Sequence, residues 1–167
     1  MFHRQSRRTF LLLFMLGLLA CGVAACSNPS SANEANLTMT PAKPTPDSNA
    51  EIEAALQRYN QLIITIDASG IATMYTVDGE LVNSGQAAIK GPKAIHDFLA
   101  SFVGVHVESN VMTTESITVT GDSAIQIGTD DQKVTVNGQL QSIHNRFEIE
   151  WARQPDSRWL IRRMSTH

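Results

Sequence analysis

Residues 123–153, SAIQIGTDDQKVTVNGQLQSIHNRFEIEWAR, contain two strand-like stretches that meet at Asn137-Gly138. Their β-branched residues and alternating side-chain character are typical of β-strands. Asn-Gly is among the strongest signals for a two-residue hairpin turn. We therefore expect residues 134–136 to pair directly with residues 139–141, as the start of a longer antiparallel pair.

The same strand-like character extends to both sides of this hairpin. Residues 105–120 (VHVESNVMTTESITVT) precede it across Gly121-Asp122, and residues 158–166 (RWLIRRMST) follow it across Pro155-Asp156-Ser157. Glycine, proline and aspartate are residues that form turns. The sequence therefore predicts four consecutive strands in an antiparallel meander.

A long amphipathic helix is expected over residues 51–67, upstream of these strands. Apolar side chains recur there every three to four residues, which places them on one face of a helix. This face carries Ile52, Ala55, Leu56, Tyr59, Leu62, Ile63 and Ile66. We expect it to cover one face of the sheet.

Shorter elements are expected between this helix and the meander. The pattern predicts a short helix over residues 71–75, a break at Asp78-Gly79 and a brief strand over residues 80–83. A third helix should start at Gly91-Pro92, because proline suits the first helical turn, and end at Gly104. Helices followed by a long antiparallel sheet indicate the α+β class. We expect three N-terminal helices packed on a curved antiparallel β-sheet.

The first 25 residues are expected to be a signal peptide. A short basic region precedes an uncharged apolar run over residues 9–20, which is too short to span a membrane comfortably. The small residues before Cys21 and before Cys26 both resemble the lipobox at which bacterial lipoprotein precursors are lipidated and cleaved. We expect Cys26 to carry the lipid, with Cys21 as the alternative. An uncleaved helix through Ala25 is a further alternative.

Residues 26–50 are rich in serine, asparagine, proline and alanine and have little to bury. Such a composition predicts a disordered tether. The remaining residues, 51–167, then form one globular domain, which is exported and held by its lipid at a bacterial membrane, in the periplasm or at the cell surface.

Composition excludes several kinds of chemistry from this domain. Both cysteines lie upstream of it, so we expect no disulfide and no thiolate nucleophile there. Residues 1–25 hold three arginines and no acidic residue, so the rest of the chain has 10 basic against 16 acidic residues. An acidic surface argues against a nucleic-acid partner. The histidines lack metal-ligand spacing, so neither a metal nor a cofactor is expected. Asp130-Asp131 is interpreted as a polar turn.

Four short motifs, in this order along residues 51–166, resemble the nuclear transport factor 2-like superfamily. They are LQRY at residues 56–59, ATMY at 72–75, IKGPKAI at 89–95 and RWLIRR at 158–163. The superfamily includes ketosteroid isomerase and SnoaL-like polyketide cyclases. The resemblance implies a cone-shaped fold whose mouth holds the ligand.

The resemblance also allows a comparison with the catalytic groups of ketosteroid isomerase. That enzyme uses an aspartate as general base, together with a tyrosine and a protonated aspartic acid that bind the substrate oxygen. Tyr59 is similar to the tyrosine, whereas the two acidic positions fall on Asn83 and Asn145. An amide donates hydrogen bonds but does not take up a proton at neutral pH. Strand alternation places Asn145 on the inner face and His144 on the outer one.

The predicted function is therefore ligand binding without ketosteroid-isomerase-type catalysis. The ligand would be a small apolar or amphipathic molecule, or a protein partner. The candidate pocket residues are Tyr59, Asn83 and Asn145 as polar contacts, with Phe98, Phe147 and Trp151 as apolar wall.

Two alternatives remain open. A SnoaL-like cyclase or isomerase-type enzyme would use Tyr59 as hydrogen-bond donor, with Glu80 as the nearest substitute base. Alternation, however, puts Glu80 and Asn83 on opposite sides of their strand. In a structural role, the outer sheet face around His144 would form a homodimer contact.

Overall fold

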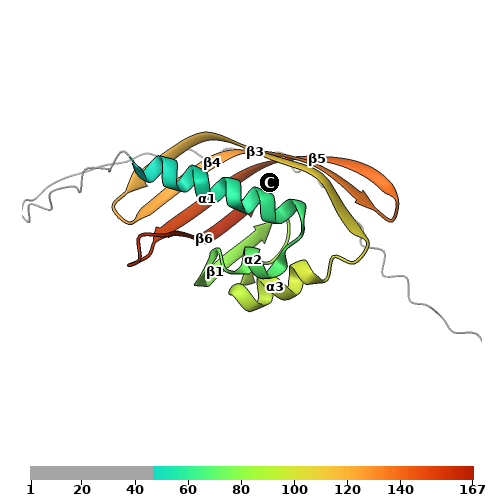
Figure 1. The fold of residues 1–167 in the computed structure, drawn as a ribbon, viewed down its shortest axis with the longest axis horizontal. Helices are drawn as coiled ribbons and strands as arrows, with labels where there is room; N and C mark the ends of the chain where they lie inside the picture. The colour runs from blue at the N-terminus through green and yellow to red at the C-terminus, as the bar shows by residue number, and fades with distance from the viewer. Residues whose placement is uncertain (1–46) are drawn as a thin grey trace, which may run out of the picture. The chain divides into compact units, whose positions relative to one another are not determined.

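A curved sheet of six strands is the centre of the computed structural model, which describes residues 47–167 (Figure 1). Across the sheet the strand order is β2-β1-β6-β5-β4-β3. The strands are β1 (Tyr75–Asn83), β2 (Ile89–Lys90), β3 (Val105–Thr120), β4 (Ser123–Val136), β5 (Gln139–Arg153) and β6 (Trp159–Thr166). The helices are α1 (Asp47–Ile64), α2 (Ala68–Ala72) and α3 (Pro92–Ala100). The expected signal peptide, Cys21, Cys26 and most of the expected tether lie outside the described residues.

The predicted meander is confirmed as β3, β4, β5 and β6, which lie side by side and antiparallel. Its central turn has the expected form. Asn137 has a φ of 52° and Gly138 a φ of 80°, and a type I′ turn requires a positive φ at both positions. Val136 lies opposite Gln139, so the register is the predicted one.

The sheet is mixed, so the prediction of an antiparallel sheet throughout is wrong. β1 runs parallel to β6, with Leu81 opposite Met164 and Asn83 opposite Thr166. Side chains alternate in the same way in parallel and antiparallel strands. The pattern of β1 therefore could not reveal its direction.

β1 is also longer than predicted. It begins at Tyr75, which the sequence pattern assigns to a helix, and continues through Asp78-Gly79, where a break is predicted. The register with β6 shifts between Tyr75 and Glu80. At Gly79 the strand is crowded, because a Cβ there would lie 3.0 Å from the carbonyl oxygen of Ile161. The glycine therefore permits a local irregularity within one strand.

The helices differ from their predicted bounds by a few residues. α1 starts at Asp47, before the predicted start, and ends at Ile64. Asp67, predicted as the end of that helix, instead caps α2, because its carboxylate accepts a hydrogen bond of 2.8 Å from the Gly70 amide. Ile66, with a φ of 49°, turns the chain between the two helices. Within residues 47–167, no helix combines the length and hydropathy needed to cross a membrane.

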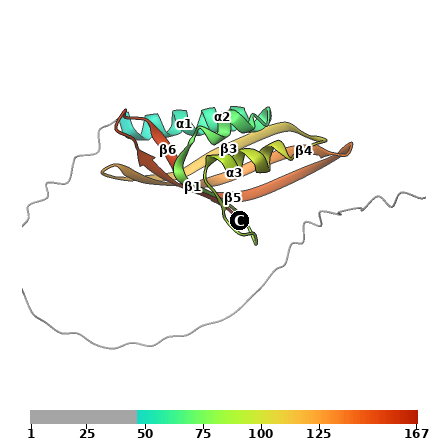
Figure 2. The ribbon, with the colours of Figure 1, turned by 90° about the horizontal axis from the view of Figure 1, so that it is seen from below.

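The core lies between α1 and one face of the sheet. Figure 2 shows α1 and α2 on the same side of the sheet. Ile52 and Leu56 of α1 are fully buried, as are Phe147, Ile149 and Trp151 of β5. Each such side chain contributes about 1.5–3 kcal/mol on burial. This apolar contact fixes the position of α1, and we call the covered face of the sheet its inner face.

Two bulges in β3, the edge strand next to β4, change which of its side chains face inward. The register shifts between Val107 and Ser109 and again between Thr114 and Ser116. A bulge places two residues of one strand opposite one residue of its neighbour, so the alternation of faces changes there. As a result Asn110, three residues after the buried Val107, is also buried.

Candidate functional site

Tyr59 lies on the buried side of α1 and is 3% exposed. Its hydroxyl is 3.5 Å from the hydroxyl of Tyr75, and the two rings meet edge to face with centroids 6.5 Å apart. The Tyr75 hydroxyl also donates a weak hydrogen bond to the Met164 sulfur, at 3.7 Å. Two tyrosine hydroxyls therefore meet inside the domain.

Asn83 and Asn145 are not brought together. The Asn83 side-chain oxygen accepts a hydrogen bond of 3.4 Å from the Thr166 hydroxyl, at the level of Phe147. Asn145 lies farther along β5, opposite Asp130 of β4. Since strands lie about 4.8 Å apart and β6 separates β1 from β5, the two amides are on the order of 10 Å apart.

The three predicted apolar residues belong to the core or pack on it. Phe147 and Trp151 are fully buried, and the Trp151 indole donates a hydrogen bond of 3.0 Å to the Gln126 side-chain oxygen. Phe98 is half-buried in α3, and its ring centroid is 4.9 Å from that of Phe102. Their predicted contact with a ligand stays a prediction, as does that of Tyr59, Asn83 and Asn145.

Four polar side chains, two buried and two half-buried, lie between α1 and the inner face, at positions that the sequence pattern does not assign to a site. We call Asn60, Asn110, Asp130 and Gln132 the inner polar cluster. The Asn110 amide donates to the Asn60 side-chain oxygen at 2.5 Å, and the Gln132 amide donates to Asp130 Oδ2 at 3.0 Å. Asn110 and Gln132 lie opposite each other on β3 and β4, so the two pairs adjoin.

Two oxygens of the inner polar cluster have no hydrogen-bond partner among the described residues. They are Asn110 Oδ1 and Asp130 Oδ1, and both residues are 3% exposed. An unpaired buried polar group costs about 1–3 kcal/mol, and more if it is charged. Because most buried polar groups are paired, exceptions often mark a functional site.

Burial also changes the acidity of this region. It raises the pKa of the Asp130 carboxyl to about 6, and the negative charge of Asp131 adds to the effect. It likewise raises the pKa of the Tyr59 hydroxyl to about 12, with a smaller contribution from the charge of Asp130. At neutral pH the Tyr59 hydroxyl therefore keeps its proton and can donate a hydrogen bond, whereas the Asp130 carboxyl gains or loses its proton close to pH 6.

The interpretation of Asp130-Asp131 as a polar turn is wrong, because both residues lie within β4. Asp130 faces inward and Asp131 is exposed. Hydropathy alone does not identify the buried face of β4, because the apolar Ile125 is 46% exposed on the outer face while the acidic Asp130 faces inward. The Asn-Gly turn does carry a signal: its register places Asp130 opposite Asn145, and residues opposite each other share a face. An inward Asn145 therefore implies an inward Asp130.

Glu80 and His144, two further residues considered from the sequence, each pair with charged neighbours. Glu80 pairs with Lys90 at 2.6 Å and with Arg163 at 3.1 Å, and the hydrogen bond from Lys90 holds the pKa of Glu80 below its usual value. His144 is exposed, with its ring nitrogen 2.6 Å from Asp131. In the described part of the chain, no three His, Cys, Asp or Glu side chains are grouped so as to hold a metal ion.

Comparison with known proteins places the chain in a family. Residues 45–165 match the family model of a SnoaL-like domain. The chain belongs to the SnoaL-like domain family. This confirms the predicted membership of the nuclear transport factor 2-like superfamily. No protein with a curated description matches the chain.

Solved structures resemble the SnoaL-like domain in fold. A ketosteroid isomerase-like protein from Erwinia carotovora atroseptica SCRI1043 has a TM-score of 0.67 at 20% identity, over 73% of this chain and 96% of that one. ActVI-ORFA from Streptomyces coelicolor has a TM-score of 0.62 at 17% identity, over 71% and 95%. At these identities the likeness shows the fold alone. The match covers 96% of the Erwinia chain, so that protein consists almost entirely of this fold.

The stability of the SnoaL-like domain should depend on Asp130 between about pH 4 and 6. Its carboxyl has a pKa of about 6 in the folded state against 3.8 for a free side chain. The folded state therefore binds this proton more tightly, so the free energy of unfolding falls as pH rises through this window, by roughly 3 kcal/mol. Asp130→Asn should remove this loss, and urea unfolding across the window measures it.

The control for this prediction is Asp122→Asn, which removes an exposed carboxylate in the turn between β3 and β4. Asp131→Asn is unsuitable, because the charge of Asp131 contributes to the raised pKa of Asp130. The difference in unfolding free energy between Asp130→Asn and the unmodified domain should increase with pH, whereas that for Asp122→Asn should change little. Parallel pH profiles for the unmodified domain and Asp130→Asn would show that burial does not raise the pKa of this carboxyl.

Proposed function

We propose that the SnoaL-like domain binds a small amphipathic ligand between α1 and the inner face of the sheet. The observation that carries the proposal is the pair of unpaired, buried oxygens on Asn110 and Asp130. Both are acceptors, so they call for a ligand that donates hydrogen bonds, such as an alcohol, a phenol or an amine. The Tyr59 hydroxyl would exchange its long 3.5 Å contact with Tyr75 for a hydrogen bond donated to an acceptor atom of the same ligand.

The rest of the ligand should be apolar. Met112, which lies opposite Asp130 on β3, is 6% exposed, and the neighbouring inner face is dominated by buried apolar side chains. Ligand sites are mostly apolar, with a few polar groups that fix orientation and give specificity. A compact apolar body with one hydroxyl or amino group fits this arrangement.

Naphthol and its methyl ether test this proposal, because only naphthol donates a hydrogen bond. Residues 45–167 should bind naphthol more tightly than the ether. Asp130→Val introduces a strand-favouring apolar side chain and removes the acceptor, so it should weaken naphthol binding about tenfold or more and abolish the preference. Titration of the probe fluorescence measures both affinities.

Asp131→Val is the matched control, since it removes a carboxylate from the outer face of the same strand. It should leave both affinities unchanged. Equal binding of naphthol and its ether, or an unchanged preference in Asp130→Val, would contradict the proposed role of the inner polar cluster.

A second candidate is a SnoaL-like cyclase or isomerase-type enzyme. The observation in its favour is the Asp130 carboxyl, whose pKa of about 6 suits a general base at neutral pH. The Tyr59 hydroxyl, whose pKa is affected by that carboxylate, would stabilise an enolate oxygen. In this candidate, Asp130 of β4 takes the role of the two acidic residues whose positions are occupied here by Asn83 and Asn145.

Proton exchange in heavy water separates the two candidates. With tetralone as the probe ketone, an enzyme of this kind should accelerate deuterium uptake next to the carbonyl group, as followed by NMR. Asp130→Asn should reduce the rate about a hundredfold, since a positioned base contributes about 10²–10⁴. Glu80→Gln should have no effect, because Glu80 pairs with Lys90 and Arg163. Exchange no faster than in buffer would leave binding as the function.

We also propose that the domain works at a bacterial membrane, held by a lipid on Cys26 or alternatively Cys21. The support is the signal-like segment before these cysteines and the anchoring energy of acyl chains, about 0.8 kcal/mol per buried methylene. In cells fed an alkyne fatty acid, Cys26→Ser should lose both the label and its place in the membrane fraction, while Cys21→Ser keeps them. The reverse result assigns the lipid to Cys21. Label retained after replacement of both cysteines by serine, or no label on the unmodified protein, would contradict lipidation of these cysteines.

A further inference from the structure

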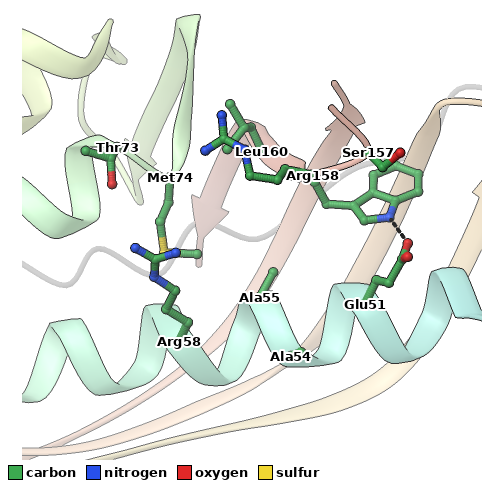
Figure 3. A pocket seen from close by; sticks show the side chains of 10 residues that line it. Glu51, Ala54, Ala55, Arg58, Thr73, Met74, Ser157, Arg158 and Leu160 are labelled. Carbon is green, nitrogen blue, oxygen red and sulfur yellow. Dashed lines mark hydrogen bonds between the residues drawn. The ribbon is translucent and has the colours of Figure 1, made fainter. Parts of the chain in front are cut away.

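A groove runs along the outside of α1, between this helix and the start of β6, and encloses about 410 Å³ (Figure 3). Its lining includes Ala54, Ala55 and Arg58 from α1 and Arg158 and Trp159 from the other side. Small-molecule sites have volumes of roughly 300–1,000 Å³, so its size is sufficient for such a ligand. None of these residues belongs to the inner polar cluster.

The hollow of this groove results from two small residues. Ala54 and Ala55 lie between Glu51 and Arg58, one helical turn from each, so longer side chains border a low stretch of the helix surface. Met74, which is 5% exposed, supplies apolar surface from across the groove. The helix rises about 1.5 Å per residue, so the distance from Glu51 to Arg58 is about 10 Å.

The acidic group at one end of the groove, the Glu51 carboxylate, already has hydrogen-bond partners. The Glu51 carboxylate accepts hydrogen bonds from the Trp159 indole at 3.1 Å and from Arg153 at 3.2 Å. The Arg153 guanidinium also lies 5.7 Å from the centroid of the Trp159 ring. Glu51 therefore adds little uncompensated negative charge to the groove.

The other end is positive. In Figure 3 the side chains of Arg58 and Arg158 extend toward the part of the groove where Thr73 and Met74 lie, away from Glu51. Arg158 pairs with Asp156 at 2.8 Å, and within residues 47–167 no ion pair joins Arg58 to an acidic side chain. Guanidinium groups bind carboxylates and phosphates through paired hydrogen bonds.

We propose that this groove is a second ligand site, for a free amphipathic anion. A carboxylate or phosphate head would lie against Arg58 and Arg158, and an apolar body of about 10 Å would cover Ala54 and Met74 in the direction of Trp159. The site uses charge and shape, whereas the inner polar cluster uses hydrogen-bond acceptors. It is therefore independent of the proposed function.

Decanoate and decanol are a matched pair of probes, because they share a chain length and differ in charge. Calorimetric titration of residues 45–167 should show tighter binding of decanoate. Arg58→Gln and Arg158→Gln should each weaken it about fivefold, and the double variant about 25-fold. Ala54→Leu fills the groove and keeps a residue of high helix propensity at this position, so it should abolish binding. Tryptophan fluorescence gives a second readout, because Trp159 lines the groove and Trp151 does not.

Two controls make the result specific. Arg162→Gln removes an exposed arginine that pairs with Glu150 on the sheet and should leave decanoate affinity unchanged. Asp130→Val should also leave it unchanged, which separates this site from the inner polar cluster. Equal affinity for decanol, unchanged affinity in the double arginine variant, or binding only to anionic phosphatidylglycerol vesicles would overturn the proposal.

Discussion

Helix α1 and the inner face of the sheet bury each other's apolar side chains, and the polar features of the domain take their positions from that contact. Ile52 and Leu56 are fully buried on the same helix that carries Asn60 inward and Arg58 outward. The helix is thus a shared wall between two regions of different chemistry. A change in either region can leave the apolar contact intact, whereas loss of that contact would displace both regions together.

The two regions handle charge in opposite ways. Asp130 is 3% exposed and its charge is poorly solvated, so a single donated hydrogen bond has a large effect in this low-dielectric environment. Arg58 and Arg158 are exposed, so water and salt screen them and their attraction for an anion depends on ionic strength. As the proposed ligand sites, one region would select for hydrogen-bonding geometry and the other for net charge.

The sequence was sufficient for the elements that local chemistry determines. The Asn137-Gly138 turn fixes the central hairpin and its register, and the alternation of β5 places Asn145 inward. The direction of β1 could not be predicted, because it depends on a partner strand about 80 residues away. Nor could the inward position of Asn110, since a bulge that reverses alternation has no clear signature in VHVESNVMTT. The inward position of Asp130 could have been predicted from its pairing with Asn145, but the polarity of its side chain favours the outer face.

The bulges of β3 have a consequence beyond the inner polar cluster. This strand forms one edge of the sheet and extends over 16 residues, and a long regular edge is a template on which another chain can add its own strand. The extra residues at the two bulges are Glu108 and Glu115, and both are exposed. Irregular backbone and charged side chains on an edge discourage aggregation. At the proposed membrane location, where copies would be concentrated in two dimensions, the irregularities that turn Asn110 inward would also keep neighbouring sheets from joining.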